Sequence, residues 1–138
     1  MQRPTTILDS SYPTVREARK DIIDDIVDII SEKNIHLKID KMELYLIIDE
    51  ALTNAMEHGN HWEPDKEVKI NVSINSQHLK IAISDQGSGF LRRGEKNINS
   101  PHLLPRGRGI YIIKQFCKPV WNKKGNQIIL NIELEKNR

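Results

Sequence analysis

Residues 43–60, ELYLIIDEALTNAMEHGN, form the stretch on which the interpretation of this chain depends. Its apolar residues recur at the spacing of an amphipathic helix that buries one side; they are Leu44, Ile48, Ala51, Leu52 and Ala55. Glu50, Asn54 and Glu57 fall on an adjacent polar stripe. A carboxylate and a carboxamide one turn apart point the same way, so a general base and a metal-binding oxygen could act on one substrate. Taken alone, the stretch is better explained as a surface helix with a solvated face.

Helical periodicity also precedes this stretch and predicts a helix over residues 14–33. Thr14 and Glu17 have the spacing of a capping box at its start. Asp40 is the predicted N-cap of the central helix, and Gly59 is its predicted C-cap. Before the first helix, residues 5–8 predict a short strand at a sheet edge.

Beyond residue 66 the period changes from helical to alternating. Residues 68–74 and 79–83 predict a hairpin with one buried face. Residues 120–122 and 128–134 predict a second hairpin, which turns at Gly125, and residues 110–117 predict a short helix between the two. This order of elements predicts an α+β fold of two layers: a mixed, mainly antiparallel sheet with helices on one face.

The size and composition of the chain predict one domain, residues 1–138. The formal net charge is +2, from 21 basic and 19 acidic residues, so nucleic acid is not the favoured partner. Cys117 is the single cysteine and cannot form an internal disulfide. The start of the chain has no leader pattern and no apolar run is long enough to cross a bilayer. We therefore expect a cytoplasmic protein without a membrane segment.

The alternation of the second strand, continued by two, brings Asp85 onto the inward face. A carboxylate there needs a buried donor, because burial without one costs several kcal/mol. Gly87 and Gly89 follow, and they allow the backbone to turn and to approach a ligand closely. An ordinary strand-ending turn with an Asx cap explains so short a motif about equally well.

A second glycine-containing motif, RGRGI at residues 106–110, enters the short helix. Gly107 and Gly109 expose free N–H groups at the positive end of the helix dipole, where phosphate binds, and Arg106 and Arg108 can add charge. Solvated arginines after a flexible loop are the plainer explanation. The long polar connection before this motif, at about residues 90–106, is interpreted as a lid that orders over bound nucleotide.

Three motifs carry a resemblance to a known family: EALTNA at residues 50–55, DQGSGF at 85–90 and GRGI at 107–110. In order and spacing they resemble the motifs of the ATPase superfamily shared by gyrase, the Hsp90 chaperone, histidine kinases and MutL. The continuation NAMEHGN at residues 54–60 and the form of the third motif look like the anti-sigma-factor serine/threonine kinases. The resemblance covers most of the chain and implies the two-layer sandwich known as the Bergerat fold.

The resemblance also implies roles for individual residues. Asp85 would accept a hydrogen bond from the adenine amino group, Asn54 would ligate Mg²⁺, and Glu50 would act as general base on the attacking hydroxyl. Together with the motif arguments above, the residues predicted to contact ATP are Asn54, Asp85, Gly87, Gly89, Arg106, Gly107, Arg108 and Gly109. Family members usually carry a Gly-Thr pair entering the last strand, but this chain has Gly125-Asn126-Gln127, which puts the threonine contact to the aspartate in doubt.

The implied function is phosphorylation of a small antagonist protein on serine or threonine, combined with sequestration of a sigma factor. A homodimer is expected by the resemblance. The alternative is a noncatalytic ATP-binding module that switches partners, in which nucleotide only orders the lid. A third interpretation, an ATP-hydrolysing motor or clamp, is disfavoured because no transducer domain follows residue 134.

Overall fold

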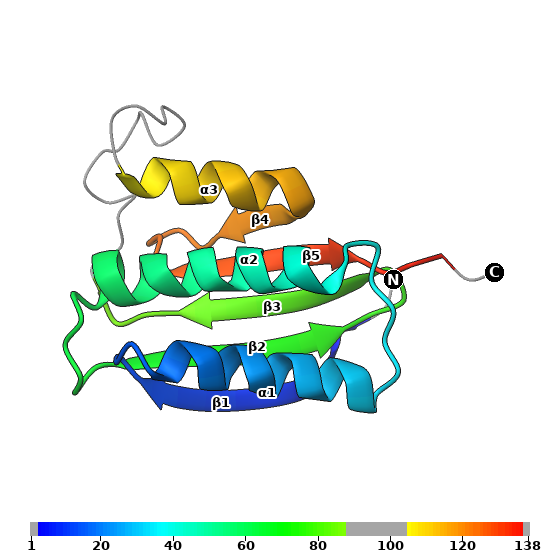
Figure 1. Cartoon of the computed structure of the whole chain (residues 1–138), viewed down its shortest axis with the longest axis horizontal. Helices are drawn as coiled ribbons and strands as arrows, with labels where there is room; N and C mark the ends of the chain where they lie inside the picture. Colours follow the sequence, from blue (N-terminus) through cyan, green and yellow to red (C-terminus); the bar gives the residue numbers. More distant parts are fainter. Residues whose placement is uncertain (1–2, 88–104, 137–138) are drawn as a thin grey trace.

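The computed structural model describes residues 3–87 and 105–136, with side chains from residue 109 onward in the second range. Five strands form one sheet in the order β1-β2-β3-β5-β4, and every described pairing is antiparallel. Figure 1 shows three helices on one face of this sheet, with α2 between α1 and α3. The predicted two-layer α+β architecture is therefore confirmed, and the described sheet contains no parallel pair.

The elements follow one another along the chain as β1 (Thr5–Pro13), α1 (Ala18–Glu32), α2 (Lys41–Thr53), the π-helix η1 (Asn54–Gly59), β2 (Glu67–Ile74), β3 (His78–Ser84), α3 (Pro105–Phe116), β4 (Lys118–Trp121) and β5 (Gln127–Glu133). None of the helices in the described ranges combines the length and the apolar character that crossing a membrane requires. The predicted lid, about residues 90–106, lies almost wholly outside the described residues.

The core lies between α1 and α2 on one side and the covered face of the sheet on the other. The apolar stripe predicted for the central helix is buried, and Ile48 and Leu52 have no exposed surface. Alternation holds in the strands, because Ile70 pairs with Ile83 and Ile81 pairs with Leu130 on the same inward face. Cross-strand apolar pairs of this kind fix the register, since a slip of one residue would turn them to solvent.

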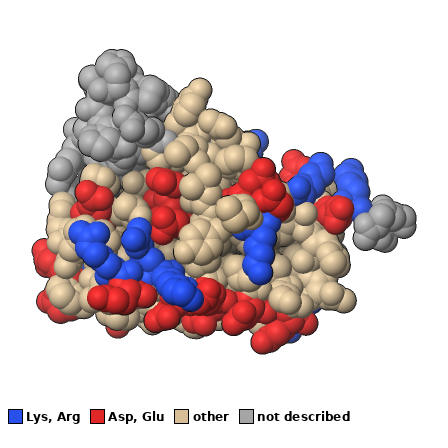
Figure 2. Space-filling view, in the orientation of Figure 1, with Lys and Arg blue, Asp and Glu red and all other residues tan. Residues whose placement is uncertain are grey.

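The outer side of α1 is strongly acidic. Figure 2 shows Asp and Glu side chains along it, and the exposed acidic residues of this helix are Asp21, Asp24, Asp25, Asp28 and Glu32. Elsewhere on the helix-covered face, Lys and Arg are interspersed with Asp and Glu. The helix therefore keeps one solvated side and buries the other, as its sequence period predicts.

Two predictions at the start of the chain are wrong. The first strand does not end at residue 8, because residues 10–13 continue to pair with β2 up to Pro13 opposite Glu67. The first helix begins at Ala18, and Thr14 does not cap it. Thr14 is buried, and its hydroxyl donates to the carbonyl of Lys66 at 2.7 Å. A long-range partner has thus displaced the local capping interaction that the spacing suggested.

The central helix is capped as predicted at its start but not at its end. The Asp40 carboxylate accepts from the Glu43 amide at 2.8 Å, and Glu43 accepts from the Asp40 amide at 2.9 Å, which completes a capping box. At the other end the helix widens into η1, and Gly59 lies inside this π-helix rather than in a left-handed cap. The reason for a glycine at position 59 is therefore not a left-handed cap.

Candidate functional site

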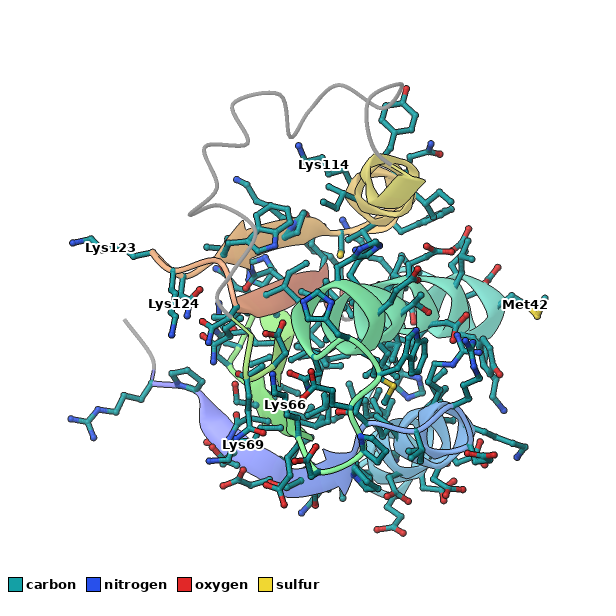
Figure 3. All side chains as sticks on the ribbon, turned by 90° about the vertical axis from the view of Figure 1, so that its left-hand side faces the viewer. Met42, Lys66, Lys69, Lys114, Lys123 and Lys124 are labelled. Atoms are coloured by element: carbon teal, nitrogen blue, oxygen red, sulfur yellow. The ribbon has the colours of Figure 1, made fainter. Side chains whose placement is uncertain are left out.

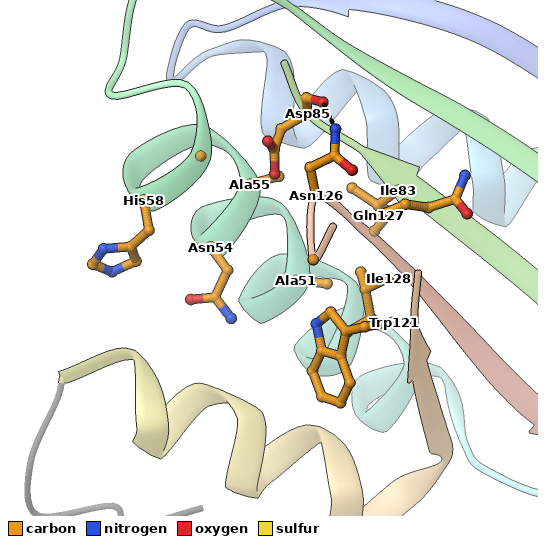
Figure 4. Close-up of a pocket in the computed structure, with 12 residues that line it drawn as sticks. Ala51, Asn54, Ala55, His58, Ile83, Asp85, Trp121, Asn126, Gln127 and Ile128 are labelled. Atoms are coloured by element: carbon orange, nitrogen blue, oxygen red, sulfur yellow. Dashed lines mark hydrogen bonds between the residues drawn. The ribbon is translucent and has the colours of Figure 1, made fainter. Parts of the chain in front are cut away.

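The polar edge of α2 continues into η1 and carries Glu50 on α2 and Asn54 at the start of η1, which lie one turn apart as predicted. Both are half-buried. Burial raises the pKa of Glu50, the neighbouring Asp49 carboxylate raises it further, and the Arg19 guanidinium lowers it. A carboxylate with a raised pKa is a better proton acceptor near neutral pH than an ordinary one. Asn54 points from the helix toward α3 (Figure 4).

Arg19 reaches this edge from α1 and was missed in the sequence. Its Nη1 donates to Asp49 Oδ1 at 3.2 Å and to Thr53 Oγ1 at 2.9 Å. Asp49 and Thr53 immediately precede Glu50 and Asn54, so one guanidinium holds the helix face beside both candidate site residues. No spacing pattern reveals this contact, because it joins helices that are packed together only in the folded chain.

Asp85 follows the last residue of β3 and faces the covered side of the sheet, as alternation predicts. Its carboxylate accepts from the Gly87 amide at 2.8 Å. Burial raises its pKa to about 6, while the Gly87 amide and then the positive charges of Lys124 and Lys66 oppose that rise. Figure 3 looks onto the end of the molecule where both lysines lie. Asp85 is thus a largely desolvated acid with unused acceptor capacity.

A pocket opens beside Asp85, between α2 with η1 and the ends of β3, β4 and β5 (Figure 4). It contains about 450 Å³ of space, part of it open to solvent. Its apolar walls are Ala51, Ala55, Ile83, Trp121 and Ile128. Its polar side chains are Asn54, His58, Asp85, Asn126 and Gln127. Apolar walls with one desolvated carboxylate suit a flat heteroaromatic ring that carries an amino group.

Two glycines allow the end of η1 and the turn after β3 to touch. A Cβ on Gly59 would overlap the Asp85 carboxyl group, and a Cβ on Gly87 would overlap the carbonyl of Gly59. Gly59 is therefore required by the close approach of Asp85, which is the reason it occurs inside a helix. Gly87, expected to approach a ligand, approaches the backbone of Gly59 in this structure.

A third glycine brings α3 against the polar edge of α2. A Cβ on Gly109 would lie 2.6 Å from Glu50 Oε1 and 3.8 Å from Asn54 Nδ2. Gly107 and Gly109 both lie within α3, so the helix starts earlier than the predicted residue 110. Its N-terminal turns therefore face Glu50 and Asn54. Gly89 and the side chains of Arg106 and Arg108 lie outside what the structure describes.

The turn before β5 holds the backbone of Asp85. The Asp85 amide donates to the Asn126 carbonyl at 2.9 Å, and Asn126 Nδ2 donates to the Asp85 carbonyl at 3.2 Å. Gln127 Nε2 donates to Ser84 Oγ at 2.9 Å. At the position where a threonine was expected, Asn126 thus holds the main chain of the aspartate instead of its carboxylate.

A magnesium ion bound with nucleotide needs few protein ligands. Within the described ranges, no three His, Cys, Asp or Glu side chains come together to hold a metal ion by themselves. In nucleotide sites, however, Mg²⁺ takes most of its ligands from water and phosphate oxygens and only one or two from the protein. The Asn54 amide oxygen at the pocket wall fits that requirement.

Comparison with known proteins places this geometry in context. The family described as "Histidine kinase-like ATPase domain" matches residues 14–132. The chain is 29% identical over 104 residues to a protein named "Anti-sigma F factor" from Oceanobacillus iheyensis, covering 70% of this chain and 71% of that protein. It is also similar to two further proteins of that name. Identity is 31% over 80 residues for Shouchella clausii, covering 55% of each chain. It is 32% over 82 residues for Halalkalibacterium halodurans, covering 56% of each, so these two alignments span only about half of the relatives.

Proposed function

Because the chain belongs to the histidine kinase-like ATPase domain family, we propose that it is an ATP-dependent protein serine/threonine kinase of the anti-sigma-factor type. Its substrate is a small antagonist protein, and it also sequesters a sigma factor. The relatives named "Anti-sigma F factor" support the partner class. A sigma-factor partner would place the protein in the cytoplasm.

The observation that carries the proposal is the desolvated Asp85 carboxylate in the wall of an apolar pocket. Adenine offers an amino group to such an acid and two flat faces to walls such as Ala55 and Ile83. The hydrogen bond to the amino group satisfies the half-buried acid, whose partial desolvation otherwise costs free energy. Guanine presents an oxygen at the same position and would repel the carboxylate.

From this base position the phosphates would extend toward the edge of α2 that faces α3. The free amides in the first turn of α3 would contact them, and the Asn54 side-chain oxygen would be the protein ligand to a Mg²⁺ ion bound with the nucleotide. When bound, the ion neutralises charge that develops on the phosphoryl group.

Glu50 would then act as the general base. Its carboxylate takes the proton of the substrate hydroxyl, the hydroxyl oxygen forms a bond to the γ-phosphorus, and the bond from that phosphorus to the β–γ bridging oxygen breaks. ADP leaves with the electron pair of the broken bond. The raised pKa of Glu50 favours proton acceptance, and Gly109 leaves the space that its carboxylate occupies.

Incubation with γ-labelled ATP, Mg²⁺ and candidate antagonist proteins tests the proposal. We expect label on a serine or threonine of the partner with the wild-type chain. Glu50→Ala should abolish transfer while ATP affinity stays nearly unchanged, because the carboxylate acts only on the hydroxyl. Equal transfer by this variant would refute the base assignment. Complex formation that depends on nucleotide but yields no phosphoprotein would instead support the noncatalytic partner-switching module.

A further inference from the structure

Asn60, the residue after η1, is a fully buried polar residue that the proposed mechanism leaves unused. Its side chain joins three other segments of the chain. Nδ2 donates to Thr14 Oγ1 at 2.8 Å and to the Glu67 carbonyl at 3.1 Å, and Oδ1 accepts from the Gln86 amide at 2.7 Å. Both donors and one acceptor are thus satisfied. A buried network in which every member is satisfied is rigid and specifies one arrangement.

The π-helix aims Asn60 at this target. The Asn60 amide donates to the Ala55 carbonyl at 2.9 Å, which is a bond between residues five apart. An α-helical turn places successive residues about 100° apart, so the extra residue in the wide turn rotates everything after it by roughly that angle. With an ordinary turn, residue 60 would face elsewhere. The π-helix therefore begins at Asn54, in the candidate site, and ends at Asn60, which hydrogen-bonds to the turn after β3.

Gln86 is the residue directly after Asp85, and its amide donates the hydrogen bond that Asn60 Oδ1 accepts. Its side-chain oxygen accepts from the Glu67 amide at 2.7 Å, so this residue is held at both backbone and side chain. On the other side, Asn126 holds the backbone of Asp85 through the two bonds described above. Two asparagines thus flank the candidate base-recognition acid, and neither hydrogen-bonds to its carboxylate. They determine where that carboxylate lies and leave its oxygens available.

We propose that Asn60 is a positioning residue for base recognition: it holds the Gln86 amide so that the Asp85 carboxylate meets the 6-amino group of adenine, and it thereby sets selectivity for adenine over 6-oxopurines. This inference rests on the proposed binding of ATP in the pocket. A hydrogen bond discriminates between ligands only if its acceptor is held in place, because an acceptor free to move can turn away from the wrong ligand.

The affinities of the full chain for ATP and for ITP, measured by calorimetry with Mg²⁺, test the inference. ITP differs from ATP in carrying an oxygen where the amino group would be. Asn60→Ala removes the acceptor of the Gln86 amide, and we expect the ratio of the two affinities to fall about tenfold, mainly through weaker ATP binding. Asn60→Asp retains an oxygen for the Gln86 amide and should retain most of the selectivity.

Thr14→Val is the matched control. It removes the hydroxyl from the same buried network and lowers stability, yet it leaves the bond from Asn60 to Gln86 in place. Selectivity should therefore stay at the wild-type value. Asn60→Ser, whose shorter side chain does not reach the Gln86 amide, replaces Asn60→Ala in the comparison if the latter does not fold.

The outcomes separate this inference from the function on which it rests. Parallel loss of ATP and ITP affinity in the Asn60 variants, with an unchanged ratio, would overturn the positioning role and leave the ATP site intact. Loss of selectivity in Thr14→Val as large as in Asn60→Ala would also overturn it, because the effect would then follow stability. A wild-type chain that binds ATP and ITP equally would contradict the role of Asp85 itself, and the inference would fail with it.

Discussion

Gly109→Ala should separate catalysis from stability, because among the described residues the only atom that a new methyl group would overlap is at the end of one flexible side chain. Gly109 lies in α3 with a backbone that alanine adopts readily, since its φ is not positive. The added Cβ would stand 2.6 Å from Glu50 Oε1 and 3.6 Å from Glu50 Cδ. Glu50 is half-buried and has a flexible side chain, so its carboxylate can move aside.

The size of the required movement follows from these distances. Ordinary contact with a Cβ begins near 3.4 Å, so Oε1 must retreat by about 0.8 Å from its present 2.6 Å. A displacement of about 1 Å in a reacting group costs on the order of 100-fold in rate, so we expect transfer to fall between about 10- and 100-fold. In the same variant, alanine favours the helix by about 0.5–1 kcal/mol over glycine. Stability should therefore be equal or higher.

Three measurements decide the matter: urea unfolding, ATP affinity by calorimetry, and transfer of labelled phosphate to the antagonist protein. We expect unfolding to shift to equal or higher urea, ATP affinity to change little, and transfer to fall. Gln115→Ala, an exposed substitution in the same helix, is the control and should leave all three unchanged. Wild-type transfer by a folded Gly109→Ala variant would refute the placement of Glu50 at the reacting hydroxyl.

Four further predictions follow from the same structure. Burial raises the pKa of Asp85 to about 6, and its carboxyl group must be ionised to accept a hydrogen bond from adenine. ATP affinity measured by calorimetry should therefore weaken as the pH falls below about 6. Asp85→Asn should weaken ATP binding at pH 7 and remove this dependence of affinity on pH. The Asp85 carboxyl group holds its proton more tightly in the folded chain than in the unfolded chain. The contribution of Asp85 to the free energy of unfolding should therefore decrease as the pH rises from 3.8 to about 6. In urea titrations, Asp85→Asn should reduce this dependence of the free energy of unfolding on pH. Arg19→Met removes a charge that lowers the pKa of Glu50, so the rising limb of transfer rate against pH should move to higher pH; Lys20→Met, which breaks an exposed pair with Asp24, should not move it. Asp40→Ala removes the capping box and should lower the free energy of unfolding by about 1 kcal/mol in urea titrations, and an unchanged value would mean that water replaces the cap at no cost.

The sequence was sufficient where neighbouring residues carry the information. The period of residues 43–60 predicts the helix and its buried stripe, and alternation predicts the strands and the inward position of Asp85. These patterns depend only on the geometry of one element and on which of its sides is apolar. The spacing from Glu50 to Asn54 belongs to the same class, as does Asp40 as the N-cap of the central helix.

Contacts between residues of different helices and strands were decided only by the tertiary structure. Thr14 has the spacing of a helix cap, but its hydroxyl donates a hydrogen bond to the carbonyl of Lys66, 52 residues away. Gly59 has the place of a C-cap, but it is a glycine because Asp85 lies against it. The widened turn of η1, the partners of Asn60 and the contact of Gly109 with Glu50 likewise depend on how helices and strands approach one another. A single sequence records each element's own period, whereas the distances between elements are set by packing in three dimensions.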